Sequence, residues 1–386
     1  MLPDWISLDC AAPSESHRQA AMARQAQLTK PLGALGRLEE VAVELAALQA
    51  TDHPGADRAP VVLFAGDHGI AAQGVSAYPP EVTVQMLRNF AGGGAAIAVL
   101  ARHLNCPLEV VDVGTLASDA VPGVVADKTR RGTRDFSVAQ ALTPEEVAFA
   151  CDAGRRALAR QADHQPQLVI FGEMGIGNTT SAAAIAAALL SCAPVDIVGS
   201  GTGLDADGRA KKAAVIVAAL ARHGLTSDAA VADILAAVGG FEIIAMAGAM
   251  IAAAQRRWPV LVDGFIVSVA ALAAVRLNPS CRPWLLFSHR SAERGHALVL
   301  DALGGLFRSL DMDVALFASE GELMAYPLPD TPCCLLLDVR LGGASGLDLQ
   351  SRLGQSGMGM PIIRLACALH NGMATFAEAA VSGRDA

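Results

Sequence analysis

The feature that most constrains the fold is a series of short apolar runs, each ending in small, polar or acidic residues. The runs are residues 61–65, 108–111, 168–171, 260–262 and 284–287, and alanine-rich stretches of helical spacing include residues 179–190, 209–221 and 243–254. Buried strands that alternate with helices predict an α/β fold with a mostly parallel sheet and helices on both faces. In such sheets ligands bind beyond the carboxyl ends of the strands, so the polar residues after each run are the first candidates for a site.

Composition excludes several classes of protein. The chain has 386 residues, of which 53% are hydrophobic, 17% charged and only 4% aromatic. This excludes a disordered chain and predicts a core of Ala, Val, Leu and Ile, in one large domain with an accessory part or in two domains.

The net charge is −9 without a basic stripe, so we expect no nucleic-acid partner. No run reaches roughly 18 to 20 apolar residues and no signal-peptide pattern is present, so we expect no membrane partner and a cytoplasmic protein.

The cysteines and histidines show no metal-ligand spacing. Eight cysteines occur without a CxxC pair, and nine histidines occur without an HxxxH or HExxH pattern. We therefore expect reduced thiols rather than disulfides, and no protein-bound metal.

The sharpest motif is the glycine-rich segment Gly-Glu-Met-Gly-Ile-Gly-Asn-Thr-Thr-Ser at 172–181, which leads into an alanine-rich helix. Asn178, Thr179 or Thr180 can cap this helix, whose free N–H groups and dipole favour an anion, so the segment is a candidate phosphate site. The alternative is a tight turn that merely needs glycine. The segment lacks the lysine of a nucleotide-binding P-loop and the glycine spacing of a dinucleotide fingerprint.

Other segments place polar groups at the same predicted edge of the sheet. A second glycine loop at 199–203 precedes Lys211 and Lys212, which are either a countercharge for phosphate or solvated surface. The turn Gly-Asp-His-Gly at 66–69 continues into a loop at 74–85, which either walls an aromatic pocket or only packs. The GxSxG elbow of a Ser-His-Asp hydrolase is absent from the sequence.

Together these segments resemble the nicotinate-nucleotide:dimethylbenzimidazole phosphoribosyltransferases. The matching segments are residues 30–39, 67–69, 74–76, 172–180, 238–241, 261–265 and 288–293, and the resemblance covers about residues 10–307 and returns at 360–382. It implies a homodimer with a Rossmann-like large domain and a small helical domain formed by both chain ends. It also implies transfer of ribose 5-phosphate from nicotinate mononucleotide to 5,6-dimethylbenzimidazole, giving α-ribazole 5'-phosphate and nicotinate for cobalamin biosynthesis.

The resemblance also suggests roles for individual residues. The loop from Gly175 to Thr180 and Lys212 would hold the 5'-phosphate, while Tyr78 and Gln85 would lie near the benzimidazole. The candidate substrate-binding residues are Tyr78, Gln85, Gly175, Gly177, Asn178, Thr179, Thr180, Gly201, Gly203, Lys212, Asp263 and Ser291. The scheme needs no cofactor and no metal.

The sequence departs from the family pattern near its C-terminus. The family's general base is a glutamate in an Arg-Leu-Gly-Glu motif, and Gly343 stands in its place here. We therefore expect Glu173 to be the catalytic carboxylate, with Glu320 or Glu322 as the other substitutes considered. Residues 310–365 resemble the middle of a response-regulator receiver domain, with Asp338 at the phosphoacceptor position.

These observations divide the chain into four parts and leave more than one function open. We expect residues 1–50 and 360–386 to form the small helical domain, 51–307 the large α/β domain, and 308–359 an atypical receiver-like insertion. The leading hypothesis is the phosphoribosyltransferase. The alternatives are a catalytically impaired homologue that binds benzimidazole or nucleotide as a binding or regulatory protein, and an unrelated phosphosugar-binding enzyme.

Overall fold

The computed structural model describes residues 2–303, apart from positions 32, 202, 290, 292 and 294, and four short strands beyond them. These strands are β7 (Leu335–Asp338), β8 (Arg340–Leu341), β9 (Ala344–Ser345) and β10 (Ile362–Leu365). β7 pairs with β10 in parallel, and β8 pairs with β9 antiparallel. Gly343, Glu320, Glu322 and the side chain of Asp338 lie outside the described residues. The expected division of the chain at 50, 307 and 359 therefore stays a prediction.

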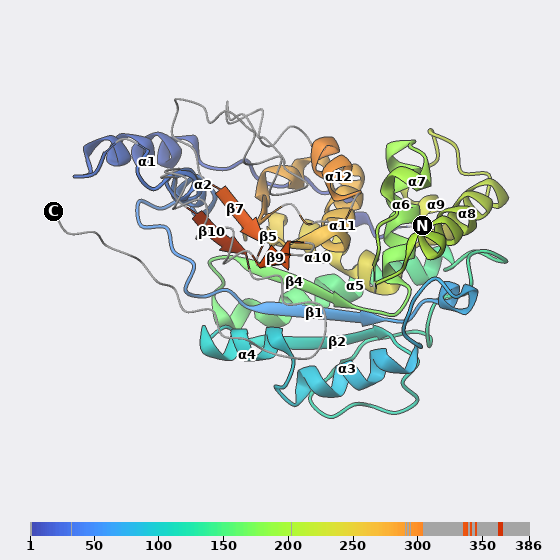
Figure 1. The fold of residues 1–386 in the computed structure, drawn as a ribbon. Coiled ribbons are helices and arrows are strands. Elements are labelled where there is room, and N and C mark those ends of the chain that lie inside the picture. Colours follow the sequence, from blue (N-terminus) through green and yellow to red (C-terminus); the bar gives the residue numbers. More distant parts are fainter. Residues whose placement is uncertain are drawn as a thin grey trace.

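Six parallel strands form the central sheet, in the order β3-β2-β1-β4-β5-β6 (Figure 1). They are β1 (Val61–Gly66), β2 (Leu108–Gly114), β3 (Val125–Ala126), β4 (Val169–Met174), β5 (Val260–Val262) and β6 (Leu285–Phe287). All neighbouring strands run in the same direction. This is the strand order of a Rossmann-type sheet, so the predicted α/β fold is confirmed.

The alternation of side chains along β1 explains why both faces of the sheet are covered. All six residues of β1 are buried. Val62 and Phe64 join the larger hydrophobic cluster, whereas Leu63 and Ala65 join a smaller one on the other face. Successive side chains of a strand point to opposite faces, so a strand that is apolar throughout needs a layer of helices on each side.

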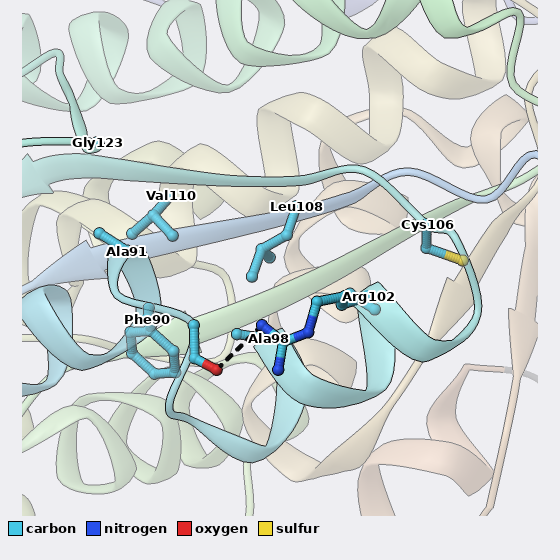
Figure 2. A pocket seen from close by; sticks show the side chains of 10 residues that line it. Phe90, Ala91, Ala98, Arg102, Cys106, Leu108, Val110 and Gly123 are labelled. Atoms are coloured by element: carbon cyan, nitrogen blue, oxygen red, sulfur yellow. Dashed lines mark hydrogen bonds between the residues drawn. The ribbon is translucent and has the colours of Figure 1, made fainter.

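The face with the smaller hydrophobic cluster is covered by α3 (Glu81–Ala91) and α4 (Ala96–His103), which lie beside β1 and β2 in Figure 1. A cavity of about 260 Å³ lies between these helices and β2, lined by side chains that include Phe90, Arg102 and Val110 (Figure 2). None of the predicted site residues lines this cavity. This cavity is therefore separate from the predicted site residues.

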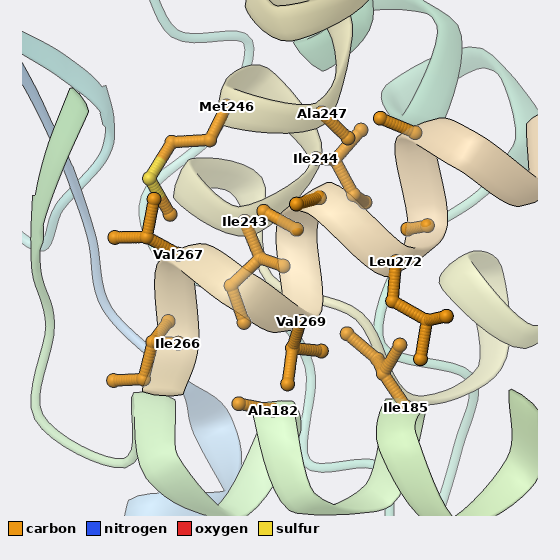
Figure 3. Packing of buried hydrophobic residues seen from close by; sticks show 14 of the residues in the cluster. Ala182, Ile185, Ile243, Ile244, Met246, Ala247, Ile266, Val267, Val269 and Leu272 are labelled. Carbon is orange, nitrogen blue, oxygen red and sulfur yellow. The ribbon is translucent and has the colours of Figure 1, made fainter. Parts of the chain in front are cut away.

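The face with the larger hydrophobic cluster is built around α10 (Phe241–Gln255), in which every residue from Phe241 to Ala254 is buried. This helix packs against α5 (Pro144–Arg160), α11 (Gly264–Leu277) and strands β1, β2 and β4. Figure 3 shows Ile243 and Met246 of α10 among the side chains of α11 and α6 (Asn178–Leu190). A helix that is apolar on all sides is stable in water only when other elements enclose it.

The other helices complete the layers and the N-terminal part. They are α1 (Glu15–Gln27), α2 (Arg37–Gln49), α7 (Pro194–Ile197), α8 (Ala206–Arg222), α9 (Val231–Val238) and α12 (His296–Ala302), with short 3-10 helices η1 (Asp4–Ser7), η2 (Gly69–Gln73), η3 (Gln161–His164) and η4 (Pro279–Trp284). Among the described residues, no helix is long and apolar enough to cross a membrane.

One local expectation was wrong. We expected a loop throughout residues 74–85, but α3 begins at Glu81, directly after Pro80 at its N-cap position. The physical reason is amphipathicity, because Thr83, Leu87 and Phe90 recur at helical spacing and are buried against the sheet. Gln85 therefore lies on a helix.

The close contact of α5 and α10 depends on glycine. A Cβ added at Gly154 of α5 would lie 2.8 Å from the backbone N of Ala249, and one added at Gly248 of α10 would lie 2.8 Å from the Cα of Cys151. The two backbones therefore approach each other through positions that have no side chain.

We predict that Gly154→Ala destabilises the protein by roughly 1 to 3 kcal/mol, because the added methyl group must push α5 and α10 apart. The measurement is the free energy of unfolding in urea. Gly172→Ala is the matched control, since a Cβ there would lie 3.9 Å from Leu63, an ordinary contact distance. Equal stability of the two variants would contradict the close contact.

Candidate active site

The candidate site lies where β1 and β4 end side by side. Phe64 of β1 is in register with Glu173 of β4, and Ala65 with Met174. In the strand order, β2 and β3 lie on one side of β1, and β4, β5 and β6 lie on its other side. The gap between β1 and β4 is therefore the topological switch point of the sheet. Ligands of open α/β sheets bind at such a point, beyond the carboxyl ends of the strands.

A buried pair of charged groups, His68 and Glu242, lies at this point. The Nε2 atom of His68, just after β1, is 2.7 Å from Oε1 of Glu242 in the first turn of α10, and neither side chain is exposed. Burial works to lower the pKa of His68, but the charge and hydrogen bond of Glu242, together with the charges of Asp67 and Glu173, raise it above its ordinary value. The carboxyl group of Glu242 therefore favours the charged form of His68.

Glu173 is a carboxyl group with a pKa near neutral pH. It lies within β4, not in the following loop as we expected, because its backbone pairs with β1. Burial and the charge of Glu242 raise the pKa of Glu173 to about 7, against the opposing effects of His68 and of a hydrogen bond from Nδ2 of Asn178. Such a group can take up or release a proton at physiological pH, as a general base or acid must.

The glycine-rich segment after β4 is a tight turn that packs on the end of β1. A Cβ at Gly175 would overlap the carbonyl oxygen of Gly66, and Gly177 has a φ of +96°. The N-cap of α6 is Gly177, without a side-chain cap, so the expected cap by Asn178, Thr179 or Thr180 was wrong.

Four N–H groups at the start of α6 are already used. Those of Asn178, Thr180 and Ser181 donate to the carbonyl oxygens of Gly175 and Gly177. The N–H of Thr179 donates to Oδ1 of Asn178 at 2.7 Å. The physical reason for the wrong cap is the left-handed glycine, which turns the chain so sharply that the backbone satisfies itself. Phosphate contacts by this loop stay a prediction.

A buried lysine supplies the positive charge of the site. Lys212 of α8 is 1% exposed, and its Nζ donates to Oγ1 of Thr179 at 2.6 Å. Burial lowers the pKa of Lys212 to about 8, although the nearby Glu293 opposes this effect. Among the described residues Lys212 forms no salt bridge, and a buried ammonium with one hydroxyl acceptor is a candidate to bind an anion. Lys211, by contrast, is exposed.

The second glycine loop lies directly beside this lysine. A Cβ at Gly201 would be 3.0 Å from Oγ1 of Thr179 and 3.3 Å from Nζ of Lys212, and Gly201 has a positive φ of +50°. The N–H of Gly201 donates to Oε1 of Glu293 at 3.1 Å. Gly203, with a φ of +106°, has nothing within 4 Å of an added Cβ and faces open space.

Asp263 and Ser291 are held by groups at the ends of β5 and β6. Asp263 accepts a hydrogen bond from Oγ of Ser288 at 2.8 Å and pairs with Nδ1 of His289 at 3.0 Å, and the His289 hydrogen bond lowers the pKa of Asp263. The hydroxyl of Ser291 is 2.8 Å from Nδ1 of His296. The structure thus brings Thr179, Gly201 and Lys212 together, and holds Asp263 and Ser291 in separate contacts.

Tyr78 and Gln85 are both exposed, on the segment that leads into α3 and on α3 itself. This segment abuts the site through Thr83, whose Oγ1 accepts the N–H of Ile176 at 3.1 Å. Proximity of Tyr78 and Gln85 to a substrate ring stays a prediction.

Four residues at the site were absent from our candidate set, namely His68, Thr83, Glu242 and Glu293. One signal was available for Glu242, because it is the only charged residue in the otherwise apolar stretch 241–254. A charged residue within a buried helix needs a partner of opposite charge or a hydrogen bond. This alone indicates that Glu242 has a structural or functional role.

Comparison with known proteins identifies the family. A family model described as "Phosphoribosyltransferase" matches residues 10–340. The chain belongs to this phosphoribosyltransferase family. Relatives named nicotinate-nucleotide--dimethylbenzimidazole phosphoribosyltransferase occur in Bradyrhizobium sp. strain BTAi1, with 88% identity over 386 residues, and in Bradyrhizobium sp. strain ORS 278, with 73% identity over 386 residues. Both alignments cover 100% of each chain.

The phosphoribosyltransferase fold is also found among solved structures. The crystal structure of CobT from Thermus thermophilus matches with a TM-score of 0.72 and 44% identity, covering 75% of this chain and 86% of that chain. The fold class and the family inferred from the sequence motifs are thereby confirmed, and the chain is a phosphoribosyltransferase.

The raised pKa of Glu173 predicts a cost in stability. The folded chain keeps this proton up to a pH of about 7, whereas the ordinary value of 4.5 applies to the unfolded chain. Between these values the unfolded chain binds fewer protons, so stability falls as pH rises from 4.5 to about 7. We expect Glu173→Gln to be more stable than the wild type by roughly 2 to 3 kcal/mol at pH 8 and by much less at pH 5.

The measurement is urea unfolding at both pH values, with the exposed Asp52→Asn as a matched loss of one carboxylate. A gain in stability for Glu173→Gln that is the same at both pH values would refute a proton held by Glu173.

Proposed function

We propose that this phosphoribosyltransferase transfers ribose 5-phosphate from nicotinate mononucleotide to 5,6-dimethylbenzimidazole, giving α-ribazole 5'-phosphate and nicotinate for cobalamin biosynthesis. A ring nitrogen of the benzimidazole forms a bond to C1' of the ribose with inversion. The bond from C1' to the pyridine nitrogen breaks, and its electron pair neutralises the positive ring of the leaving nicotinate. The second benzimidazole nitrogen loses its proton to a base. The relatives' names state this donor and acceptor.

One observation carries the proposal, a chain of hydrogen bonds from Glu173 to Lys212 across the start of α6. Nδ2 of Asn178 donates to Glu173, the N–H of Thr179 donates to Oδ1 of Asn178, and Nζ of Lys212 donates to Oγ1 of Thr179. The first two residues of one helix therefore hold a carboxylate and an ammonium in fixed positions. These are the base and the phosphate ligand that the reaction needs.

The charges of these groups fit the two ends of the reaction. We assign the 5'-phosphate to Lys212 with Thr179 and Gly201, since a buried cation favours an anion beside it. We assign the benzimidazole proton to Glu173. The leaving ring departs neutral and needs no acid, so catalysis rests mainly on alignment and on this base.

Glu173→Gln tests both the reaction and the base. We expect purified wild-type protein with both substrates to form α-ribazole 5'-phosphate and nicotinate, detected by chromatography. The variant should lose roughly 100-fold or more of kcat, because an amide cannot accept the proton. Absence of product from the wild type, with both ligands still bound in a thermal-shift assay, would instead favour the binding-protein alternative.

The pH profile of the wild type gives a second test of the same roles. Glu173 must be ionised to act as a base, so kcat/KM should rise with pH through about 7. Lys212 must be protonated to bind phosphate, so kcat/KM should fall as pH rises above about 8. The profile should therefore be a narrow bell, and a profile that is flat from pH 6 to 9 would contradict these assignments.

Lys212→Met should raise KM for nicotinate mononucleotide about 10- to 100-fold, because a charged hydrogen bond to phosphate is lost. The value of KM for dimethylbenzimidazole should change much less. Lys211→Met is the matched control, since it removes the same charge from the exposed neighbouring position. Equal KM values for the two variants would rule out Lys212 as the phosphate ligand.

We further propose that the enzyme works as a homodimer in the cytoplasm. The free cysteines support a reducing compartment, because Cys10, Cys106, Cys151, Cys192 and Cys281 are all unpaired among the described residues. The dimer is implied by the family resemblance. Light scattering with size-exclusion chromatography measures it directly.

A further inference from the structure

The ring of His68 is enclosed by glycines. A Cβ added at Gly177 would lie 3.0 Å from Cβ of His68, and one at Gly175 would lie 3.4 Å from its Cδ2 atom. A Cβ at Gly240 would overlap the ring at Cε1. The glycines of the segment after β4 therefore make room for an imidazole, in addition to shaping the turn.

The partner carboxylate is enclosed in the same way. A Cβ at Gly66 would lie 2.7 Å from Oε2 of Glu242, and one at Gly240 would lie 2.9 Å from the same atom. The His68–Glu242 pair thus joins the end of β1, the start of α10 and the turn before α6. Glu173 lies on the strand that leads into this turn, so the turn connects it to the pair.

We propose that the His68–Glu242 pair is a positioning element of the transferase site. It seats the Gly175–Gly177 turn on the end of β1, and its two opposite charges act on Glu173 across that turn. This inference rests on the proposed function, in which Glu173 accepts the benzimidazole proton. His68 and Glu242 act through Glu173 and need not touch substrate.

The groups that face Glu173 come from three elements. They are His68 after β1, Glu242 of α10 and the amide of Asn178 of α6, and the charge of Glu242 outweighs that of His68. His68 is faced in turn by Glu242, Asp67 and Glu173. Removing the cation should therefore make Glu173 harder to ionise, and removing the carboxylate should make it easier.

The test is the acid limb of the kcat/KM profile in three variants. In His68→Gln the limb should move to higher pH by about one unit, because a buried positive charge near Glu173 is lost. In Glu242→Gln it should move below the wild-type position. In the double variant it should also lie below the wild-type position, because the charge of Glu242, which outweighs that of His68, is gone.

This pattern separates electrostatic positioning from simple damage. A merely structural role would lower kcat in every variant and leave the limb in place, and that result would overturn the proposal. Each single variant leaves one member of the pair without its buried partner and can misfold, so the double variant, which carries neither group, keeps the test decisive. Thermal unfolding of each variant confirms that it is folded.

Failure of the proposed function looks different. If the wild type forms no product, or if Glu173→Gln keeps full activity, the base assignment is wrong whatever the pair does. If the wild type is active and Glu173→Gln is not, but the three limbs coincide, only the role of the pair is wrong.

Discussion

A single buried contact, between the imidazole of His68 and the carboxylate of Glu242, underlies the arrangement of this site. It connects two positions that lie 174 residues apart in the sequence. Water cannot replace either partner, because both side chains are fully buried. Loss of one partner would therefore leave an uncompensated charge in the core. The contact therefore fixes the position of the start of α10 relative to the end of β1. The surrounding glycines allow the backbones to approach that closely.

Burial also adjusts the two groups that we assign to chemistry. It raises the pKa of Glu173 to about 7 and lowers that of Lys212 to about 8. Removing a charged group from water disfavours its charged form, so one cause moves an acid and an amine in opposite directions, toward the same pH. The site is therefore adjusted to neutral pH by desolvation, at a cost in stability that a less buried site would avoid. Functional sites commonly carry this kind of cost.

The start of α6 positions the two groups that we assign to chemistry. Its N–H groups close the turn upon itself, and Asn178 and Thr179 use their side chains to hold Glu173 and Lys212. Rigid positioning by a helix terminus is favourable for catalysis, because the groups lose little freedom when substrate arrives. We therefore expect anion binding to depend chiefly on the lysine beside Gly201.

The order of apolar runs and alanine-rich stretches was enough to determine the parallel sheet and the edge at which the site lies. Local patterns decide which segments are strands and helices, and parallel strands bring their carboxyl ends together. Glu173 and the pair Lys211 and Lys212 could be marked as candidates in this way, since they lie in or near the glycine loops, and the family resemblance then favoured Lys212. The partnership of His68 with Glu242, the burial of Lys212 but not of Lys211, and the helix at Glu81 could not.

These features were decided by the tertiary structure alone. Whether a charged side chain is buried depends on which distant elements pack around it, and no local spacing encodes that. The pKa of Glu173 follows from burial and from charges on β1 and α10, which are remote in sequence. The sequence by itself thus determined the fold class, the family and the two glycine loops. Only the folded chain determined which charges are held out of water, and so which of them can do chemistry at neutral pH.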